Sequence, residues 1–196
     1  NVPTTVTSRG ASLAGGSSRG EQINSKFEDF LYVTTGASSL RSTLLSNLSN
    51  PNLSKEEILK NLEEVTKMYP YAGLPDPSRN FYSYLTGLEH AVSKEKQGIV
   101  GEIESMATEV EVELNEKPMS RGERASNDQL LRNLDNTLAS LESTSDQTVL
   151  EINEVKALYS ALEASSFEQV YDYQLSADRM NIELLFNPTV IDGASG

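Results

Sequence analysis

The sequence predicts an all-α fold: an elongated multi-helix bundle with a flexible N-terminal segment. Apolar residues recur at intervals of three and four along most of the 196-residue chain, which is the spacing of one helix face. Ser-x-x-Glu and Ser-x-x-Gln sequences, which are typical of helix N-termini, precede several of these series. Hydrophobic residues make up only 37% of the chain and Trp is absent, so we expect Leu, Ile, Val, Tyr and Phe to form an elongated core.

The first 20 residues predict the flexible segment. Residues 1–20 are almost all Thr, Ser, Gly, Ala and Arg and have no apolar period, so they cannot bury enough surface to offset the entropy of ordering. The first helical series is Ile23, Phe27, Phe30 and Leu31. The second is Leu40, Leu44, Leu45 and Leu48. We expect Gly36 to separate these two helices.

A capping box at Ser54 to Glu57 predicts the start of the next helix. Its apolar face contains Ile58, Leu62, Val65 and Tyr69, and Pro70 ends it. In the proline turn at 74–78, Asp76 is expected to cap the following helix, and Pro77 is expected to take its first position. That helix carries Phe81, Leu85, Leu88 and Val92.

A long amphipathic helix is predicted after Gly98. Val110, Val112 and Leu114 alternate with glutamates as a strand would, but the helical frame continues from Ile99, which favours a helix. Glutamates occupy the outward positions and make this face strongly negative: Glu102, Glu104, Glu109, Glu111, Glu113 and Glu116.

Pro118 and Gly122 among charged residues predict a linker at 118–125. It separates an N-terminal helical lobe (21–117) from a C-terminal hairpin or three-helix lobe (126–187), which a tail follows at 188–196. In the second lobe, capping sequences are expected at Ser126 and Ser166, and a Ser/Thr-rich turn at 143–145. The three apolar series are Leu130, Leu134, Leu138 and Leu141, then Val149, Ile152, Val155, Tyr159 and Leu162, then Val170, Tyr173, Ala177, Met180 and Leu184.

Charge and composition disfavour several functions. The 29 acidic and 16 basic residues give a net charge of −13, which repels nucleic acids and anionic lipid surfaces. The absence of Cys excludes disulfides, cysteine-ligated zinc and thiol nucleophiles. No apolar run approaches the roughly 20 residues of a membrane span, and none forms a signal-peptide core, so membrane insertion is not expected. From the start at Asn1 and the Gly-Ala-Ser-Gly end we expect either a processed or an engineered chain.

The sequence predicts no enzyme. Residues 16–20 match the G-x-S-x-G nucleophile motif, but no strand precedes them. His90 is the only histidine and lies within a predicted helix, so neither a catalytic triad nor a zinc site can be assembled. The glutamate series lacks the glycine turn of a calcium loop. We therefore assign no catalytic, cofactor-binding or metal-binding residues.

Two features suggest protein binding. Five aromatic residues gather around the proline turn: Tyr69, Tyr71, Phe81, Tyr82 and Tyr84. Either Tyr69 and Phe81 join two helices there, or the cluster is an exposed docking patch with Tyr82 facing outward. The second feature is the glutamate face. The partner-binding candidates are Tyr71, Tyr82, Tyr84, Glu102, Glu109 and Glu113.

Residues 27–115 resemble the type III secretion gatekeeper family, the YopN/InvE/MxiC-like proteins. The resemblance rests on Phe27 to Tyr32, on the helix from Ile58 to Tyr69 with its proline turn, and on the helices Phe81 to Leu88 and Ile99 to Leu114. It implies a bacterial cytoplasmic plug protein that binds a secretion chaperone and the export apparatus. The resemblance also allows that the plug protein is itself secreted.

A self-assembling structural subunit is the alternative. The heptad-like spacing at Leu130 to Leu141 and at Val170 to Leu184 would suit helical seams between copies. Such a chain would form an extracellular filament or part of a virion.

Overall fold

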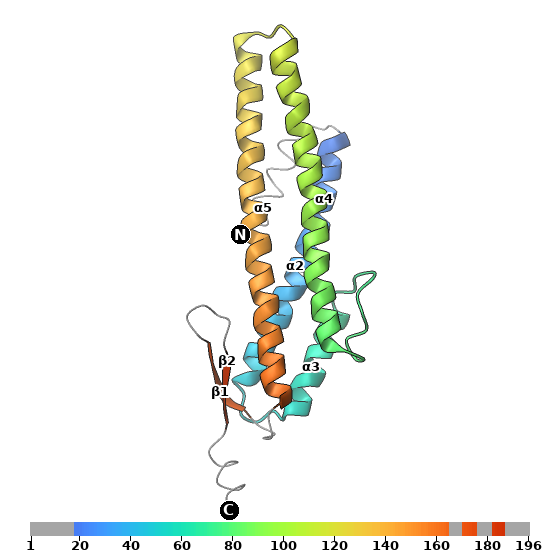
Figure 1. Cartoon of the computed structure of the whole chain (residues 1–196), viewed down its shortest axis with the longest axis vertical. Coiled ribbons are helices and arrows are strands. Elements are labelled where there is room, and N and C mark those ends of the chain that lie inside the picture. The colour runs from blue at the N-terminus through green and yellow to red at the C-terminus, as the bar shows by residue number, and fades with distance from the viewer. Residues whose placement is uncertain (1–17, 165–169, 176–181, 187–196) are drawn as a thin grey trace, which may run out of the picture. The chain divides into compact units, whose positions relative to one another are not determined.

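The computed structural model describes residues 18–164, 170–175 and 182–186. Four helices follow one another in this part of the chain: α2 (Ser18–Leu48), α3 (Lys55–Lys67), α4 (Phe81–Glu116) and α5 (Arg121–Ala164) (Figure 1). Two short strands come next, β1 (Val170–Leu175) and β2 (Ile182–Phe186). The predicted all-α helical bundle is confirmed. Most of the segment 1–20 and the tail 188–196 lie outside the described residues.

The chain divides into two compact units. Unit 1 contains Asn1–Tyr32 and Ala91–Gln147, and unit 2 contains Val33–His90 and Thr148–Gly196. Each unit therefore includes a section of α2, α4 and α5. This division differs from the predicted lobes at 21–117 and 126–187, because the helices are longer than predicted and pass through both units.

Helix α2 is continuous, so the prediction that Gly36 separates two helices is wrong. Glycine in a helix costs about 1 kcal/mol relative to alanine, which is not enough to stop a helix that packs well. A side chain at Gly36 would stand only 3.2 Å from Cβ of Tyr69. The glycine thus makes room for the tyrosine.

The predicted start of α3 is confirmed, and that of α4 is corrected. The Glu57 N–H donates to Ser54 Oγ (3.2 Å), while the Ser54 N–H donates to the Glu57 carboxylate (3.1 Å). At α4 the cap is Asn80, whose side-chain oxygen accepts the Ser83 N–H (3.0 Å). Asp76, the predicted cap, closes the preceding turn instead, and Pro77 lies in that turn.

Helix α4 runs without interruption through Gly98 to Glu116, which confirms the helical interpretation of 110–114. Residues 117–120 connect it to α5, so the predicted linker at 118–125 is largely helical. The Glu123 N–H donates to Ser120 Oγ (3.1 Å), which makes Ser120, rather than Ser126, the N-cap of α5. Ser120 to Glu123 has the same Ser-x-x-Glu spacing and comes six residues earlier.

Helix α5 also passes through the Ser/Thr-rich segment 143–145, where a turn was predicted. Ser145 is buried there. Hydroxyl side chains in a helix interior can donate to the carbonyl one turn before, as Thr137 does to Asn133 (2.8 Å), so they need not interrupt it.

The helix predicted at 170–184 is wrong, because β1 and β2 form an antiparallel two-stranded sheet there. Tyr173 pairs with Leu184 and Leu175 with Ile182. Aromatic and β-branched residues favour extended backbone, and this preference competes with the helical spacing on which the prediction relied.

Each unit buries its own apolar residues. In unit 1 they are Ile23, Phe27, Phe30, Ala91, Val92, Ile99, Ile103, Met106, Val110, Leu134 and Leu141. In unit 2 the largest groups come from Leu40, Leu44, Leu48, Ile58, Leu62, Phe81, Leu85, Leu88, Ile152, Val155, Leu158 and Leu162. Within the described residues, no helix is both long and apolar enough to cross a membrane.

A charged pair lies within the core of unit 2. Arg41 Nε on α2 donates to Glu154 Oε2 on α5 (3.0 Å), and the Glu154 side chain is fully buried. Ser38, one turn before Arg41, donates to the Glu151 carboxylate (2.9 Å). These polar bonds join α2 to α5 at one defined register.

Candidate partner-binding site

The connecting segment (residues 68–80) joins α3 to α4 in unit 2. The segment packs closely against two helices at positions where each helix has a glycine, Gly36 of α2 and Gly87 of α4. Tyr69 packs on Gly36 of α2, where Ser39 Oγ donates to the tyrosine hydroxyl (3.1 Å). Further along, Pro75 lies against Gly87 of α4, so closely that a Cβ on Gly87 would stand 2.7 Å from the proline Cδ. Gly73 between them has a φ of 92°, which favours glycine.

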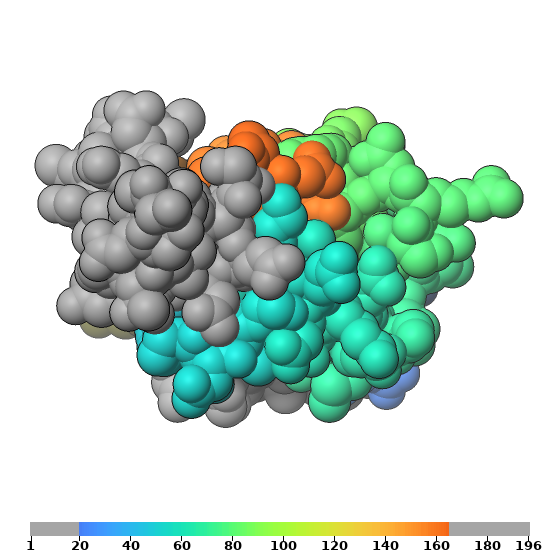
Figure 2. All heavy atoms as spheres, turned by 90° about the horizontal axis from the view of Figure 1, so that it is seen from below, coloured from blue at the N-terminus to red at the C-terminus, as the bar shows by residue number. Residues whose placement is uncertain are grey.

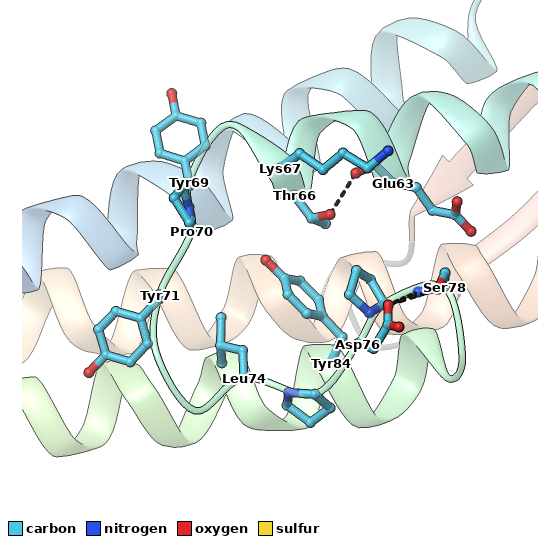
Figure 3. Close-up of a pocket in the computed structure, with 12 residues that line it drawn as sticks. Glu63, Thr66, Lys67, Tyr69, Pro70, Tyr71, Leu74, Asp76, Ser78 and Tyr84 are labelled. Atoms are coloured by element: carbon cyan, nitrogen blue, oxygen red, sulfur yellow. Dashed lines mark hydrogen bonds between the residues drawn. The ribbon is translucent and has the colours of Figure 1, made fainter.

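A pocket of about 390 Å³ lies between the connecting segment, the C-terminal half of α3 and the start of α4. Figure 3 shows the α3 side chains along one edge, residues 74–78 along the opposite edge, and Tyr84 between them. The lining residues are Glu63, Thr66, Lys67, Tyr69, Pro70, Tyr71, Leu74, Pro75, Asp76, Pro77, Ser78 and Tyr84. Tyrosine, proline and leucine thus supply most of the wall. Figure 2 shows the surface that α3 and the connecting segment form. On this surface α3 lies next to the C-terminal turn of α5, where Lys55 Nζ donates to the Glu163 carbonyl.

Three charged side chains line this pocket. The Ser78 hydroxyl donates to Asp76 Oδ1 (2.8 Å), as does the Ser78 N–H (2.9 Å). Both bonds stabilise the carboxylate and hold the pKa of Asp76 below its usual value, with a smaller contribution from Arg79. Lys67 Nζ forms an ion pair with the Glu64 carboxylate on the surface of α3 (3.1 Å). Glu63 is the third charged group.

The three candidate tyrosines have different environments. Tyr71 lines the pocket and is half-buried. Tyr84 also reaches the pocket but is only 6% exposed, so it is mainly a core residue. Tyr82 is half-buried rather than fully exposed. Its ring meets Tyr159 of α5 edge-on at 5.0 Å, and its hydroxyl donates to Glu163 (3.2 Å).

The alternative interpretation, in which Tyr69 and Phe81 join two helices, also needs correction. Tyr69 packs on Gly36 of α2, whereas Phe81 stacks on Tyr159 of α5, with 4.7 Å between ring centroids. Each ring is thus anchored to a different helix. Burial, together with the nearby Glu163 carboxylate, raises the pKa of Tyr159 to about 12, so this phenol stays neutral at physiological pH.

The candidate glutamates lie on α4 in unit 1, whereas the tyrosines belong to unit 2. Glu109 is exposed, and Glu102 and Glu113 are half-buried. Glu113 forms an ion pair with Lys117 one turn later (3.6 Å). The predicted negative face is therefore partly neutralised near the end of α4.

The residues considered for catalysis are only partly within the described part of the chain. Ser18 to Gly20 belong to the first turn of α2, and Gly16 and Ser17 lie outside the described residues. His90 is exposed on α4. Among the described residues, no three His, Cys, Asp or Glu side chains are arranged to hold a metal ion.

Sequence reasoning missed Glu63, Lys67 and Asp76 as pocket residues, and it missed Gly36 and Gly87 as packing sites. A glycine within a helical apolar series was the available signal for the latter two. Comparison with family models, curated proteins and solved structures finds no match to this chain.

Proposed function

We propose that the chain acts by binding other proteins, as a regulatory plug of bacterial type III secretion. The observation that carries the proposal is the pocket beneath the connecting segment, which combines aromatic and proline side chains with a few charged groups. Its position in the segment 27–115, which resembles the gatekeepers, supports the more specific role. Such a plug acts in the bacterial cytoplasm and binds a secretion chaperone and the export apparatus.

The outward glutamates of α4 offer a second contact surface. Glu104, Glu109 and Glu111 are exposed, and exposed like charges attract a basic surface and speed its association. Glu102 and Glu113 are half-buried and lie seven and four residues from Glu109, on the same side of the helix.

Affinity capture tests the proposal. The tagged chain, expressed in a bacterium with a type III secretion system, should retain a secretion chaperone or an export-apparatus subunit. Glu109→Lys should weaken that capture, whereas Glu28→Lys, an equal charge change at an exposed position of α2, should not. Capture of neither class of component by the unaltered chain would refute the role in secretion.

A self-assembling subunit is the second candidate. In one of its two predicted seams, at 170–184, the described residues 170–175 and 182–184 belong to strands. In the other seam, Leu134 and Leu141 are buried in unit 1, while Leu130 and Leu138 are only half-buried. Three exposed apolar side chains among the described residues favour this candidate: Met68 (70% exposed), Val112 (45%) and Leu150 (36%). Light scattering over a wide concentration range should show growing particles if it holds, and a constant monomer mass if it does not.

A further inference from the structure

We infer that the pocket beneath the connecting segment receives a positively charged side chain, lysine or arginine, from a protein partner. The inference rests on the part of the proposed function by which the chain binds other proteins, and it does not require the role in secretion. It concerns only residues of unit 2, most of them in α3 and the connecting segment.

The charge of the lining favours a cation. Glu63 and Asp76 contribute two carboxylates, and Lys67 is the single basic side chain of the lining. Lys67 forms an exposed ion pair with Glu64 at 3.1 Å, and Arg79, outside the lining, acts on the charge of Asp76. Within the lining itself, the two carboxylates exceed the one ammonium group by one charge. Asp76 accepts two hydrogen bonds from Ser78, which lower the pKa of its carboxyl group further below neutral pH. The balance left for a ligand is negative.

The aromatic lining favours the same ligand. Tyr84 lies inside the pocket between its two edges, whereas Tyr69 and Tyr71 contribute to its rim (Figure 3). The face of an aromatic ring attracts a cation through its quadrupole. Lysine and arginine also carry apolar stems, which pack well against leucine and proline. Leu74, Pro75 and Pro77 provide such a surface here. An anionic ligand would face two carboxylates, and a purely apolar ligand would gain nothing from their charge.

The size of the pocket indicates a peptide rather than a bare cation. Its volume of about 390 Å³ lies within the range of about 300–1,000 Å³ that is usual for organic ligands. It can therefore hold the charged side chain together with part of its flanking backbone.

Titration of the purified full chain with short capped peptides tests the inference. The peptides are identical except for one central residue, which is arginine, lysine, citrulline or glutamate. Citrulline has nearly the shape of arginine without its charge. We expect the arginine and lysine peptides to bind about tenfold more tightly than the citrulline peptide, as judged by calorimetry or by NMR shifts of the tyrosine rings. Equal binding of the arginine and citrulline peptides would overturn the inference.

Charge variants show whether binding occurs in this pocket. Glu63→Gln and Asp76→Asn should each weaken binding of the arginine peptide about threefold to tenfold, whereas Lys67→Gln should strengthen it. Glu56→Gln and Lys60→Gln are the matched controls, because both residues are exposed on α3 outside the lining. Weaker binding in the Lys67 variant, or equal effects in the controls, would contradict the assignment.

Tyr71 provides a test that does not alter charge. Tyr71→Phe keeps an aromatic ring and should retain binding, whereas Tyr71→Leu should lose it. Circular dichroism verifies that both variants fold. If free spermidine bound as tightly as the arginine peptide, the pocket would be a polyamine site, and the protein partner would be refuted.

These experiments use only the purified chain and defined peptides, so they do not depend on the secretion apparatus. If peptides bind in the pocket but no secretion component is captured, the secretion role fails and the inference stands. If secretion components are captured but the peptide series shows no charge preference, the secretion role stands and the inference about the pocket fails.

Discussion

At the scale of single residues, two glycines determine where the connecting segment lies. Gly87 on α4 leaves room for Pro75, and Gly36 on α2 leaves room for Tyr69. At both positions an added methyl group would meet a ring whose movement is restricted. The pocket therefore depends on the absence of side chains as much as on the residues that line it.

Gly87→Ala should destabilise the chain by about 1–3 kcal/mol, because the new methyl group would stand 2.7 Å from Pro75 Cδ. Gly101→Ala is the matched control on the same helix. Nothing lies within 4 Å of its Cβ position, so it should stabilise the chain by up to about 1 kcal/mol. Urea unfolding of both variants measures these changes. A stabilising Gly87→Ala would show that the segment does not pack on α4 as described.

Tyr159 predicts a loss of stability at alkaline pH. Its pKa in the folded chain is about 12, because burial and the charge of Glu163 disfavour the phenolate. An unfolded tyrosine has a pKa of about 10. Folding therefore favours the neutral form, and this contribution to stability is complete below about pH 10 and is lost as the pH rises towards 12.

Urea unfolding of the wild-type chain and of Tyr159→Phe measures this effect. Phenylalanine does not titrate, so the unfolding midpoint of the variant should fall less between pH 9 and about pH 11.5 than that of the wild type. An equal fall in both proteins would mean that Tyr159 is not the group responsible.

At the scale of helices, two serines compete as the N-cap of α5: Ser120, which caps the helix in the structure, and Ser126, which the sequence predicted. Ser120→Ala removes the hydroxyl that accepts the Glu123 N–H, and it should cost about 1 kcal/mol of unfolding free energy. Ser126→Ala alters an exposed interior position of α5 and should be neutral or slightly stabilising. Thermal unfolding of the two variants provides the comparison. The reverse order of stabilities would place the helix start at Ser126.

Periodicity was sufficient to predict the helical class and the start of α3, since both depend on local spacing. Helix ends were harder to predict. Gly36, Gly98 and residues 143–145 all resemble interruptions, yet packing of the surrounding apolar residues outweighs their weak local preferences.

The pocket was harder still to predict. Its aromatic residues were noticed because they are close in sequence, and Tyr71 and Tyr84 do line it. Whether a tyrosine faces a pocket or a neighbouring helix depends on tertiary contacts. Tyr82 packs on α5, whose Tyr159 is 77 positions away in the sequence, and no local pattern reports that contact.

At the scale of the whole molecule, both units share three continuous helices. Unit 2 consists of two separate stretches of the chain, because residues 33–90 pack with the α5 section at 148–164. That section supplies four buried residues to the core of unit 2: Ile152, Val155, Leu158 and Leu162. Neither unit is therefore a contiguous stretch of chain that could be expressed alone.

The intact chain should unfold in a single transition, because melting of one unit breaks helices that continue into the other. Circular dichroism reports on all the helices, whereas tyrosine fluorescence reports mainly on unit 2, since Tyr32 is the only tyrosine of unit 1. The two urea curves should coincide. Separate midpoints would show that the units unfold independently.

The buried Arg41–Glu154 pair restricts how the sequence of this protein can change. If α2 slid by one turn, about 5.4 Å, Glu154 would face Ala37 or Leu45, and neither residue can neutralise a carboxylate. Loss of the Arg41 charge would leave the Glu154 carboxylate buried without its counter-charge, at a cost of about 3–5 kcal/mol, whereas Arg41 is 22% exposed and can be solvated when Glu154 is lost. Related chains that replace Arg41 should therefore replace Glu154 as well, so an acidic residue at position 154 should occur only with a basic residue at position 41.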